Sequence, residues 1–294
     1  MEYLPHFNEL FIAAGLEYSF HKTEKTMDAY NMAKQFCREG SCGIIGIGGD
    51  GTFQEIAAGM VDAFAHGEKI PTPLGVFAAG SGNDFAISLA ESKAAALNAR
   101  KKHFDDAAKD FFAKILQGQT RSVDIITANS MAYLNIANLG LDARIVQNAA
   151  NLKQKFGRYA YFAAVYKSIT QHKNMPLEIT IDGQSTQNAY TLVAICNGQY
   201  YGGGMRIAPT AQIDDGQITL CTVNALSRPK TMIIFPTLML EKHTSLKAVT
   251  YTNCKKITIK LPPGQETLCL DGNLYPASGE IEFRLLPSVL DVFV

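Results

Sequence analysis

The stretch Gly43–Thr52, GIIGIGGDGT, places an apolar segment directly before glycines, a carboxylate and a hydroxyl. The run from Ile44 to Ile47 predicts a buried strand, of the kind covered on both faces in a parallel sheet. Helical patterns flank this strand, and a second strand and turn are predicted within Pro73–Asp84. Strands that alternate with helices predict an α/β fold with a parallel sheet.

The pattern changes near Arg121, where short segments rich in Val, Ile, Thr and Tyr are closed by Gly, Asn and Asp. Such segments predict an antiparallel β-sandwich. We therefore expect two domains: residues 1–120 form an α/β nucleotide-binding domain, and residues 121–294 form a β-sandwich domain whose last strand can return to the first. Helices are expected to interrupt the sandwich at Asn151–Ile169 and Pro229–Lys242.

Composition limits the possible partners and compartments. The 294 residues include 27 basic and 27 acidic ones, so no overall charge attracts nucleic acid or an anionic membrane. The six cysteines form no CxxC pair, and the opening residues lack the features of a signal peptide. No uncharged apolar stretch is long enough to span a membrane. These features predict a cytoplasmic protein whose membrane contact, if any, is local.

The glycines after the first strand fit a phosphate site. Gly48, Gly49 and Gly51 allow backbone amides to approach an anion, and Thr52 begins a helix whose N-terminal amides favour negative charge. Asp50 would repel a phosphate unless a cation lay between them, which indicates a magnesium-bound nucleotide. An isolated GGDG is equally compatible with a simple tight turn.

A second strand exit carries the same chemistry. The segment Ala78–Phe85, AAGSGNDF, again combines small residues with a hydroxyl at Ser81 and a carboxylate at Asp84. Ligands of open parallel sheets bind at the carboxyl ends of the strands. Two neighbouring exits with matching residues therefore favour a ligand site over two independent turns.

Together with three further segments, these loops resemble the diacylglycerol-kinase-like lipid kinases, especially the soluble bacterial YegS-type branch, which is related to sphingosine kinases. The resemblance is carried by HKTEKTMDA, GGDGTFQEI, GSGNDFA, NGQYYGGGMRIAPTAQIDDGQITL and LDGN, which begin at His21, Gly48, Gly80, Asn197 and Leu270. It implies a kinase that binds ATP between an α/β domain and a β-sandwich and phosphorylates the hydroxyl of a lipid such as diacylglycerol, in phospholipid biosynthesis.

The resemblance also implies roles for individual residues. The implied ATP contacts are Thr23, Gly48, Gly49, Asp50, Gly51, Thr52, Phe53, Gln54, Glu55 and Ser81, with serine in place of the usual threonine at 81. Asp50 and Asp84 would organise Mg²⁺ near the phosphates. A structural Mg²⁺ would be held by Asp215 and by the backbone carbonyls of Gln212 and Gln217.

The hairpin turn at Leu270–Asn273 departs from the family pattern. The family commonly has Asp-Gly-Glu there, and its glutamate is treated as the proton acceptor, whereas this chain has Asn273. An amide cannot accept that proton, so either Asp271 is the base or the chain is slow or inactive. Asp-Gly is also simply the favoured dipeptide of a hairpin turn.

Two further expectations concern the membrane and the N-terminus. Lys153, Lys155, Arg158 and Lys167 surround an aromatic helix that either contacts lipid headgroups during transient peripheral association or merely covers the sandwich. Relatives begin with a strand and an Asn-Pro-x-x-Gly loop that this chain lacks, so we expect a missing first strand and a less enclosed nucleotide.

Three functions remain open from the sequence. The first is a Mg²⁺- and ATP-dependent lipid kinase. The second is an NAD-kinase-like enzyme, which the GGGM, IAP and DDG segments disfavour. The third is a catalytically weak lipid- or nucleotide-binding relative, suggested by Asn273 and the missing strand. No nucleic-acid partner is expected, a homodimer is possible, and the sequence does not identify the lipid.

Overall fold

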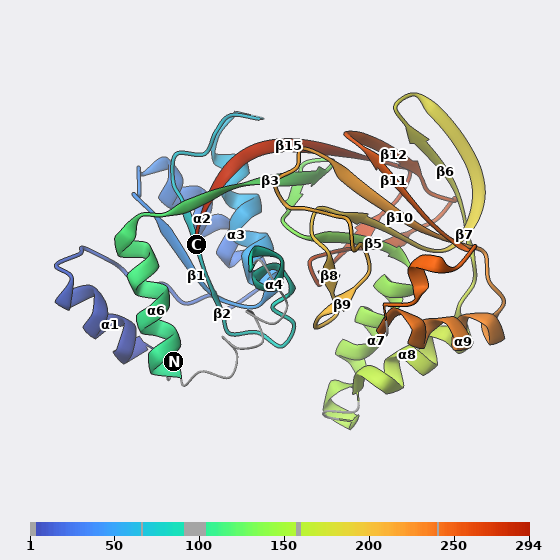
Figure 1. The fold of residues 1–294 in the computed structure, drawn as a ribbon, viewed down its shortest axis with the longest axis horizontal. Coiled ribbons are helices and arrows are strands. Elements are labelled where there is room, and N and C mark those ends of the chain that lie inside the picture. The colour runs from blue at the N-terminus through green and yellow to red at the C-terminus, as the bar shows by residue number, and fades with distance from the viewer. Residues whose placement is uncertain (1–3, 66, 91–103, 157–159, 240) are drawn as a thin grey trace.

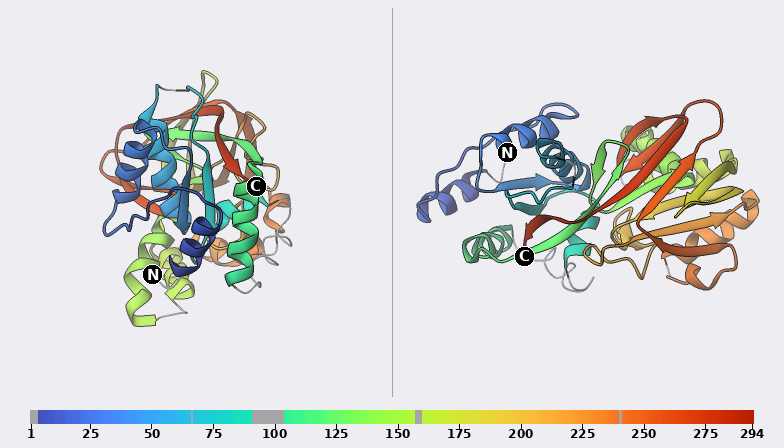
Figure 2. Two further views of the ribbon diagram at one scale, coloured as in Figure 1. Left: turned by 90° about the vertical axis from the view of Figure 1, so that its left-hand side faces the viewer. Right: turned by 90° about the horizontal axis from the view of Figure 1, so that it is seen from above.

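The computed structural model describes residues 4–65, 67–90, 104–156, 160–239 and 241–294. Figure 1 shows two parts side by side, an α/β part on the left and a strand-rich part on the right, bridged by the long strands β3 and β15. The view from above in Figure 2 shows the same elongated arrangement. In the part of the chain that is described, no helix is both long and apolar enough to cross a bilayer.

The α/β part comprises the first elements of the chain. They are α1 (Leu4–Ala13), α2 (Asp28–Arg38), β1 (Ile44–Gly48), α3 (Asp50–Ala63), β2 (Leu74–Ala78), α4 (Asp84–Leu89) and α6 (Phe104–Gln117). β1 and β2 pair in parallel, and helix α3 follows β1 after a single intervening residue, Gly49. The predicted alternation of strand and helix is therefore confirmed for this part of the molecule.

The second part carries most of the strands. They are β3 (Thr120–Ala128), β4 (Met131–Tyr133), β5 (Ile136–Gly140), β6 (Met175–Ile181), β7 (Gln184–Cys196), β8 (Tyr200–Tyr201), β9 (Met205–Arg206), β10 (Ile218–Asn224), β11 (Val249–Cys254), β12 (Lys256–Lys260), β13 (Glu266–Leu270), β14 (Asn273–Ala277) and β15 (Glu280–Phe293). Apart from β15 with β2, the pairs among them are antiparallel, as the sandwich prediction requires.

Three helices and one short 3₁₀ turn accompany these strands. They are α7 (Leu141–Phe156), α8 (Ala160–Gln171), α9 (Arg228–Met239) and η2 (His243–Ser245). In Figure 1 the three α-helices lie together on the lower side of the strand-rich part. Their apolar side chains share one core with the facing sheet, in which Ile145, Ile169 and Phe235 pack with Leu192 and Cys196.

The last strand joins the two parts. β15 runs antiparallel to β3 over most of its length, and near its end Val292 pairs with Leu74 of the parallel strand β2. In the described residues, thirteen strands thereby form one continuous sheet that begins with β1 at its edge. The C-terminal residues consequently help to hold the strands whose exits carry the glycine loops.

The segment Leu16–Phe20 also has a strand-like sequence, but the structure assigns no strand there. Its aromatic side chains pack instead on the first helix, where Tyr18 contacts the Phe11 ring at a tilt and Phe20 meets it edge-to-face. Helix α1 in turn packs on α6 through Phe7, Phe11 and Phe112. These aromatic contacts account for the apolar residues without a ladder of backbone hydrogen bonds.

Candidate active site

The two glycine loops that follow β1 and β2 touch each other through their backbones. A Cβ added to Gly80 would lie 2.4 Å from the Cα of Gly49, closer than any real contact. The Ala79 amide also donates to the Gly48 carbonyl at 2.7 Å. The glycines are therefore required here for the close approach of two loops, and the two strand exits form one site.

Asp50 occupies the first turn of α3 and reaches the neighbouring loop. Its Oδ1 accepts a hydrogen bond from the Phe85 amide at 2.9 Å. Burial raises the pKa of Asp50, and amide hydrogen bonds from Phe85 and its neighbours partly oppose that rise. A Cβ at Gly82 would meet Oδ2 of Asp50 at 2.8 Å and Oδ2 of Asp84 at 3.0 Å, so the two carboxylates face each other across this glycine.

Asp84 is buried and binds the second part of the molecule. Its carboxylate accepts from the amides of Gly203 and Gly204 at 2.9 and 2.6 Å, which fixes the Gly202–Gly204 loop against α4. An ionised carboxylate that accepts two amide hydrogen bonds is a strong clamp. Asp84 thus holds the two parts together at the site, beside Asp50.

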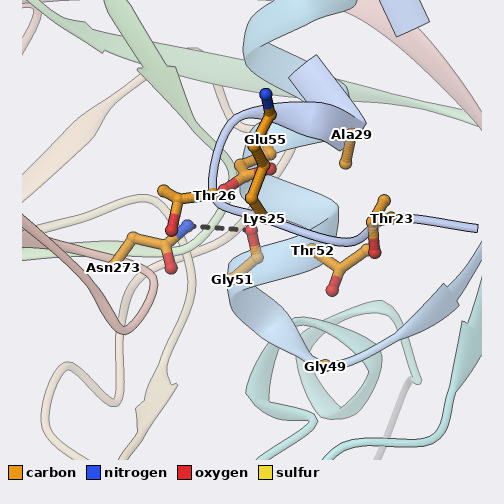
Figure 3. Close-up of a pocket in the computed structure, with 9 residues that line it drawn as sticks. All are labelled: Thr23, Lys25, Thr26, Ala29, Gly49, Gly51, Thr52, Glu55 and Asn273. Carbon is orange, nitrogen blue, oxygen red and sulfur yellow. Dashed lines mark hydrogen bonds between the residues drawn. The ribbon is translucent and has the colours of Figure 1, made fainter. Parts of the chain in front are cut away.

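A cavity of about 320 Å³ opens beside the N-terminus of α3. Figure 3 shows its lining residues, which are Thr23, Lys25, Thr26, Ala29, Gly49, Gly51, Thr52, Glu55 and Asn273. Glu55 positions the facing loop, because its Oε1 accepts from the Met27 amide at 2.9 Å. Three segments distant in sequence therefore enclose one polar cavity at a helix N-terminus.

Asn273 enters this cavity from the β13–β14 hairpin. Its Nδ2 donates to the Gly51 carbonyl at 2.9 Å and to Gln54 Oε1 at 2.8 Å, and Tyr275 donates to the same Gln54 oxygen at 2.8 Å. Gln54 in turn donates to the Ala132 carbonyl at 2.7 Å. Figure 3 shows the Asn273 amide nitrogen directed at Gly51. The orientation of the amide is set by these two donated hydrogen bonds.

Asp271 lies in the turn of the same hairpin. Asp271 and Gly272 have φ of 46° and 93°, the positive values of a two-residue type I′ turn. The buried carboxylate accepts from the amides of Leu134, Asn135 and Ile136, the shortest being 2.7 Å to Ile136. Burial raises its pKa to about 7, the nearby Asp50 adds to the rise, and the amide hydrogen bonds oppose it. This carboxyl therefore titrates near neutral pH.

The other predicted nucleotide contacts lie in different settings. Ser81 is exposed in the second glycine loop, while Thr23 is exposed at the mouth of the cavity. The side chain of Phe53 is fully buried and packs in the core with Ile56, and that of Gln54 points away toward β4. Neither Phe53 nor Gln54 lines the cavity, because the helical turn directs both side chains inward.

The predicted structural magnesium site lies in the loop before β10. Oδ1 of Asp215 accepts from the Gln217 amide at 3.0 Å, and the pKa of Asp215 is raised by burial and by the neighbouring Asp124 and Asp214. No group of three or more side chains of the metal-binding types surrounds a possible ion within the described ranges. An ion here would depend on backbone carbonyls and water, which Mg²⁺ accepts.

Several residues that organise the site were not predicted from the sequence. Fully buried Asp124 accepts from the amides of Gly216 and Ser288, both at 2.7 Å, and Asn197 donates to the Asp124 and Leu134 carbonyls. No motif marks Asp124. Lys25 and Thr26, which line the cavity, lie inside the HKTEKTMDA segment, so the resemblance in that segment could have identified them.

Of the four basic side chains predicted to surround the aromatic helix, only that of Lys167 lies among the described residues. The side chains of Lys153 and Lys155, and Arg158 as a whole, fall outside the described residues, whereas Lys167 is half-buried on α8. The sequence before β1 contains no Asn-Pro-x-x-Gly segment, and in the described residues β1 lies at the edge of the sheet.

Two family models match the chain in succession. The diacylglycerol kinase catalytic domain matches residues 1–128, and the YegS C-terminal NAD kinase beta sandwich-like domain matches residues 135–294. The junction between them falls in the β3–β5 region, where Leu134–Ile136 binds Asp271. Both halves of the candidate site therefore lie within matched segments.

Individual relatives and solved structures agree with these models. A diacylglycerol kinase of Staphylococcus aureus strain bovine RF122 / ET3-1 is 28% identical over 282 residues, which are 95% of this chain and 83% of that protein. The crystal structure of a putative diacylglycerol kinase from Bacillus anthracis strain Sterne aligns with a TM-score of 0.73 at 23% identity, covering 99% of this chain and 92% of that one. At 23% identity, this structural alignment shows a shared fold.

Proposed function

The chain belongs to the diacylglycerol-kinase-like, YegS-type lipid kinases, and we propose that it transfers the γ-phosphoryl group of magnesium-bound ATP to the hydroxyl of a lipid such as diacylglycerol. One observation carries this proposal: the hairpin with Asp271 and Asn273 meets the glycine loop at the start of α3, beside the cavity that Thr23 and Thr52 line. A phosphate donor site and a candidate base thereby come from opposite parts of the molecule.

The nucleotide phosphates are proposed to bind at the N-terminus of α3. The cavity opens at the first turn of the helix, where the first amides have no acceptor within the helix, and Gly49 and Gly51 line it without a Cβ atom. Thr23 and Thr52 add hydroxyl groups at the cavity wall. Lys25 is a cation in the same wall and is available to offset the phosphate charge.

A divalent cation fits this arrangement through Asp50. Its half-buried carboxylate lies at the start of α3 with Oδ2 near Gly82, next to the cavity-lining Gly49 and Gly51, so a cation bound to it would lie beside phosphates at the helix N-terminus. Bound Mg²⁺ would supply neutralisation of the phosphate charge during transfer. Asp84 serves mainly to hold Gly203 and Gly204, and Asp215 with the carbonyls of Gln212 and Gln217 is the proposed site of a separate structural ion.

Asp271 is the proposed proton acceptor for the lipid hydroxyl. A pKa of about 7 suits a general base at neutral pH. The three amides make four hydrogen bonds to the carboxylate, two to each oxygen, so a substrate hydroxyl would share an oxygen with them or displace one of them. Asn273 contributes no proton transfer in this scheme and instead positions the hairpin against Gly51.

Transfer of labelled γ-phosphate from ATP to a panel of lipids, with magnesium, tests the proposal. Diacylglycerol, phosphatidylglycerol, a sphingoid base and a polyprenol form the panel, and NAD is a non-lipid arm. We expect a labelled lipid with the wild-type chain and its loss in Asp50→Ala and Asp271→Ala. Asp62→Asn is the matched control, because Asp62 lies on the same helix as Asp50 and pairs with Lys34 far from the cavity. Label on NAD alone would overturn the lipid assignment.

A catalytically weak binding protein is the second candidate, and Asn273 favours it. Where the family commonly has a glutamate, this chain has an amide whose nitrogen is already donated to Gly51 and Gln54. ATP binding measured by calorimetry, without transfer to any lipid of the panel, would support this alternative. Transfer that depends on Asp271 would exclude it.

A further inference from the structure

Helix α9 exposes apolar side chains that the fold does not cover. Thr231 and Phe235 face the core, whereas Pro229, Met232, Ile233 and Pro236 are exposed. At helical spacing these four residues share one side, which we call the α9 apolar face. Ile233 is 73% exposed, although a β-branched aliphatic residue of this size is usually buried. The helix is thus apolar on both its inner and outer sides.

The charges near this face have one sign. Neither α9 nor the neighbouring α8 contains an acidic residue. Arg228 and Lys230 are exposed at the start of α9, and Lys242 is exposed just beyond its end. Glu241 is the nearby acid, and it pairs with Arg206 at 3.5 Å. Because the whole chain has equal numbers of basic and acidic residues, this local excess of cations is a property of the face itself.

The neighbouring helix α8 also exposes an aromatic side chain. Tyr166 on α8 is 63% exposed, and α8 packs beside α9. Arg228 also donates to the His172 carbonyl at 3.3 Å, which ties the start of α9 to the end of α8. Figure 1 shows both helices on the outer, lower side of the strand-rich part. A ring with a polar tip beside aliphatic side chains suits the boundary between headgroups and acyl chains.

From these observations we infer that the α9 apolar face docks on an anionic lipid bilayer, with Met232 and Ile233 entering the acyl boundary and Arg228, Lys230 and Lys242 contacting headgroups. This inference rests on the proposed function, because a kinase whose acceptor is a lipid must reach that lipid in a bilayer. It centres the membrane contact on α9, beside Tyr166 of the 151–167 helix for which the sequence predicted such a contact. Interfacial helices of this kind bind through buried apolar area and cationic attraction.

Another exposed aliphatic residue provides a matched comparison. Ile12 on α1 is 64% exposed, but it lies in the other part of the molecule, and α1 contains Glu9 and no Lys or Arg. Figure 1 shows α1 and α9 at opposite ends of the molecule. Exposure is therefore similar at the two sites while the charge differs, so an anionic surface should select α9.

The chain contains no tryptophan, which permits a direct test. Ile233→Trp and Ile12→Trp each introduce a single tryptophan, and its emission is recorded with vesicles of phosphatidylcholine alone or mixed with phosphatidylglycerol. We expect a blue shift for Ile233→Trp with the anionic vesicles, reduced by high salt, and no shift for Ile12→Trp. An unchanged emission of Ile233→Trp, or equal shifts in both variants, would overturn the inference.

Vesicle sedimentation gives a second readout that does not depend on catalysis. Ile233→Asp should lower partitioning onto anionic vesicles about tenfold, whereas Ile12→Asp should change it less than about twofold. Ile233→Asp should still phosphorylate a short-chain, water-dispersed diacylglycerol. If no lipid is phosphorylated but α9-dependent binding persists, the kinase proposal fails and the docking surface stands. If Ile233→Asp instead converts a dimer to a monomer and leaves vesicle binding intact, the face is covered by a second copy and the inference is wrong.

Discussion

Asn273 donates a hydrogen bond from its side-chain amide to the backbone carbonyl of Gly51 at 2.9 Å, across 222 positions of the sequence. The contact joins the hairpin of the strand-rich part to the first turn of α3. It is close enough that a Cβ on Gly51 would lie 2.6 Å from Asn273 Oδ1. Asn273, where the resemblance implies a glutamate, therefore joins the two parts of the molecule at the candidate site.

Asn273→Asp should destabilise the protein although the shape is conserved. The carboxylate cannot donate, so it would face the Gly51 carbonyl and Gln54 Oε1, two acceptors, without a proton between them. We expect a loss of about 1 to 3 kcal/mol in the free energy of unfolding at pH 8, measured by urea titration. Asn273→Ala, which removes the side chain without adding a charge, is the control and should cost less. Equal or greater stability of the aspartate variant would contradict the hydrogen-bond assignment.

Gly80→Ala should separate the two glycine loops. The added methyl group would overlap the Cα of Gly49, and backbone on backbone contact cannot be relieved by a rotamer change. We expect ATP affinity to fall by at least about tenfold, measured by calorimetry, with a destabilisation of about 1 to 3 kcal/mol. Gly43→Ala is the control, because its Cβ would make only ordinary contacts of 3.7 Å or more.

Asp84→Asn should loosen the clamp between α4 and the glycine loop at 202–204. The amide group offers one acceptor oxygen where the carboxylate receives two amides, and its NH₂ would face a donor. Because these hydrogen bonds are charge-assisted, we expect a loss of about 1.5 to 3 kcal/mol. Hydrogen exchange of the Gly203 and Gly204 amides should accelerate in this variant. Unchanged exchange at both amides would show that another group holds the loop.

The rate of phosphoryl transfer should rise with pH through about 7 and then level off, because burial holds the pKa of Asp271 near that value and only the ionised form accepts a proton. A pH series of kcat between about 5 and 9 measures this. Asp50→Asn is informative, since removing the neighbouring negative charge should shift the midpoint of any residual activity to lower pH. A profile that falls with rising pH would contradict the role proposed for Asp271.

Asp142, which does not line the cavity, should make the stability of the protein depend on pH. Burial raises its pKa to about 7, and its Oδ2 has no hydrogen-bond partner. The unfolded chain releases this proton near pH 3.9, so the folded state binds the extra proton between about pH 4 and 7 and stability falls as pH rises through that range. Between pH 5 and 8, the free energy of unfolding of Asp142→Asn should therefore rise relative to that of the wild type by on the order of 1 to 3 kcal/mol. Thermal unfolding at each pH measures this difference. A constant difference across pH would contradict this.

Local patterns determined much of the architecture. The apolar run at Ile44–Ile47 became β1, the Asp-Gly dipeptide became the turn between β13 and β14, and the glycines after each strand became the touching loops. Such features depend on spacing and backbone conformation within a few residues, which a sequence displays directly. The same is true of the change from alternating strands and helices to short strands near Arg121.

The tertiary structure decided which groups meet. Asp84 binds the amides of residues about 120 positions away, the Phe53 side chain turns into the core, and unmarked Asp124 joins Gly216 to Ser288. The exposure of Ile233 likewise depends on which side of α9 packs against the sheet. These outcomes arise from contacts between distant segments, and the energy of such contacts is set by burial and geometry that exist only once the chain has folded.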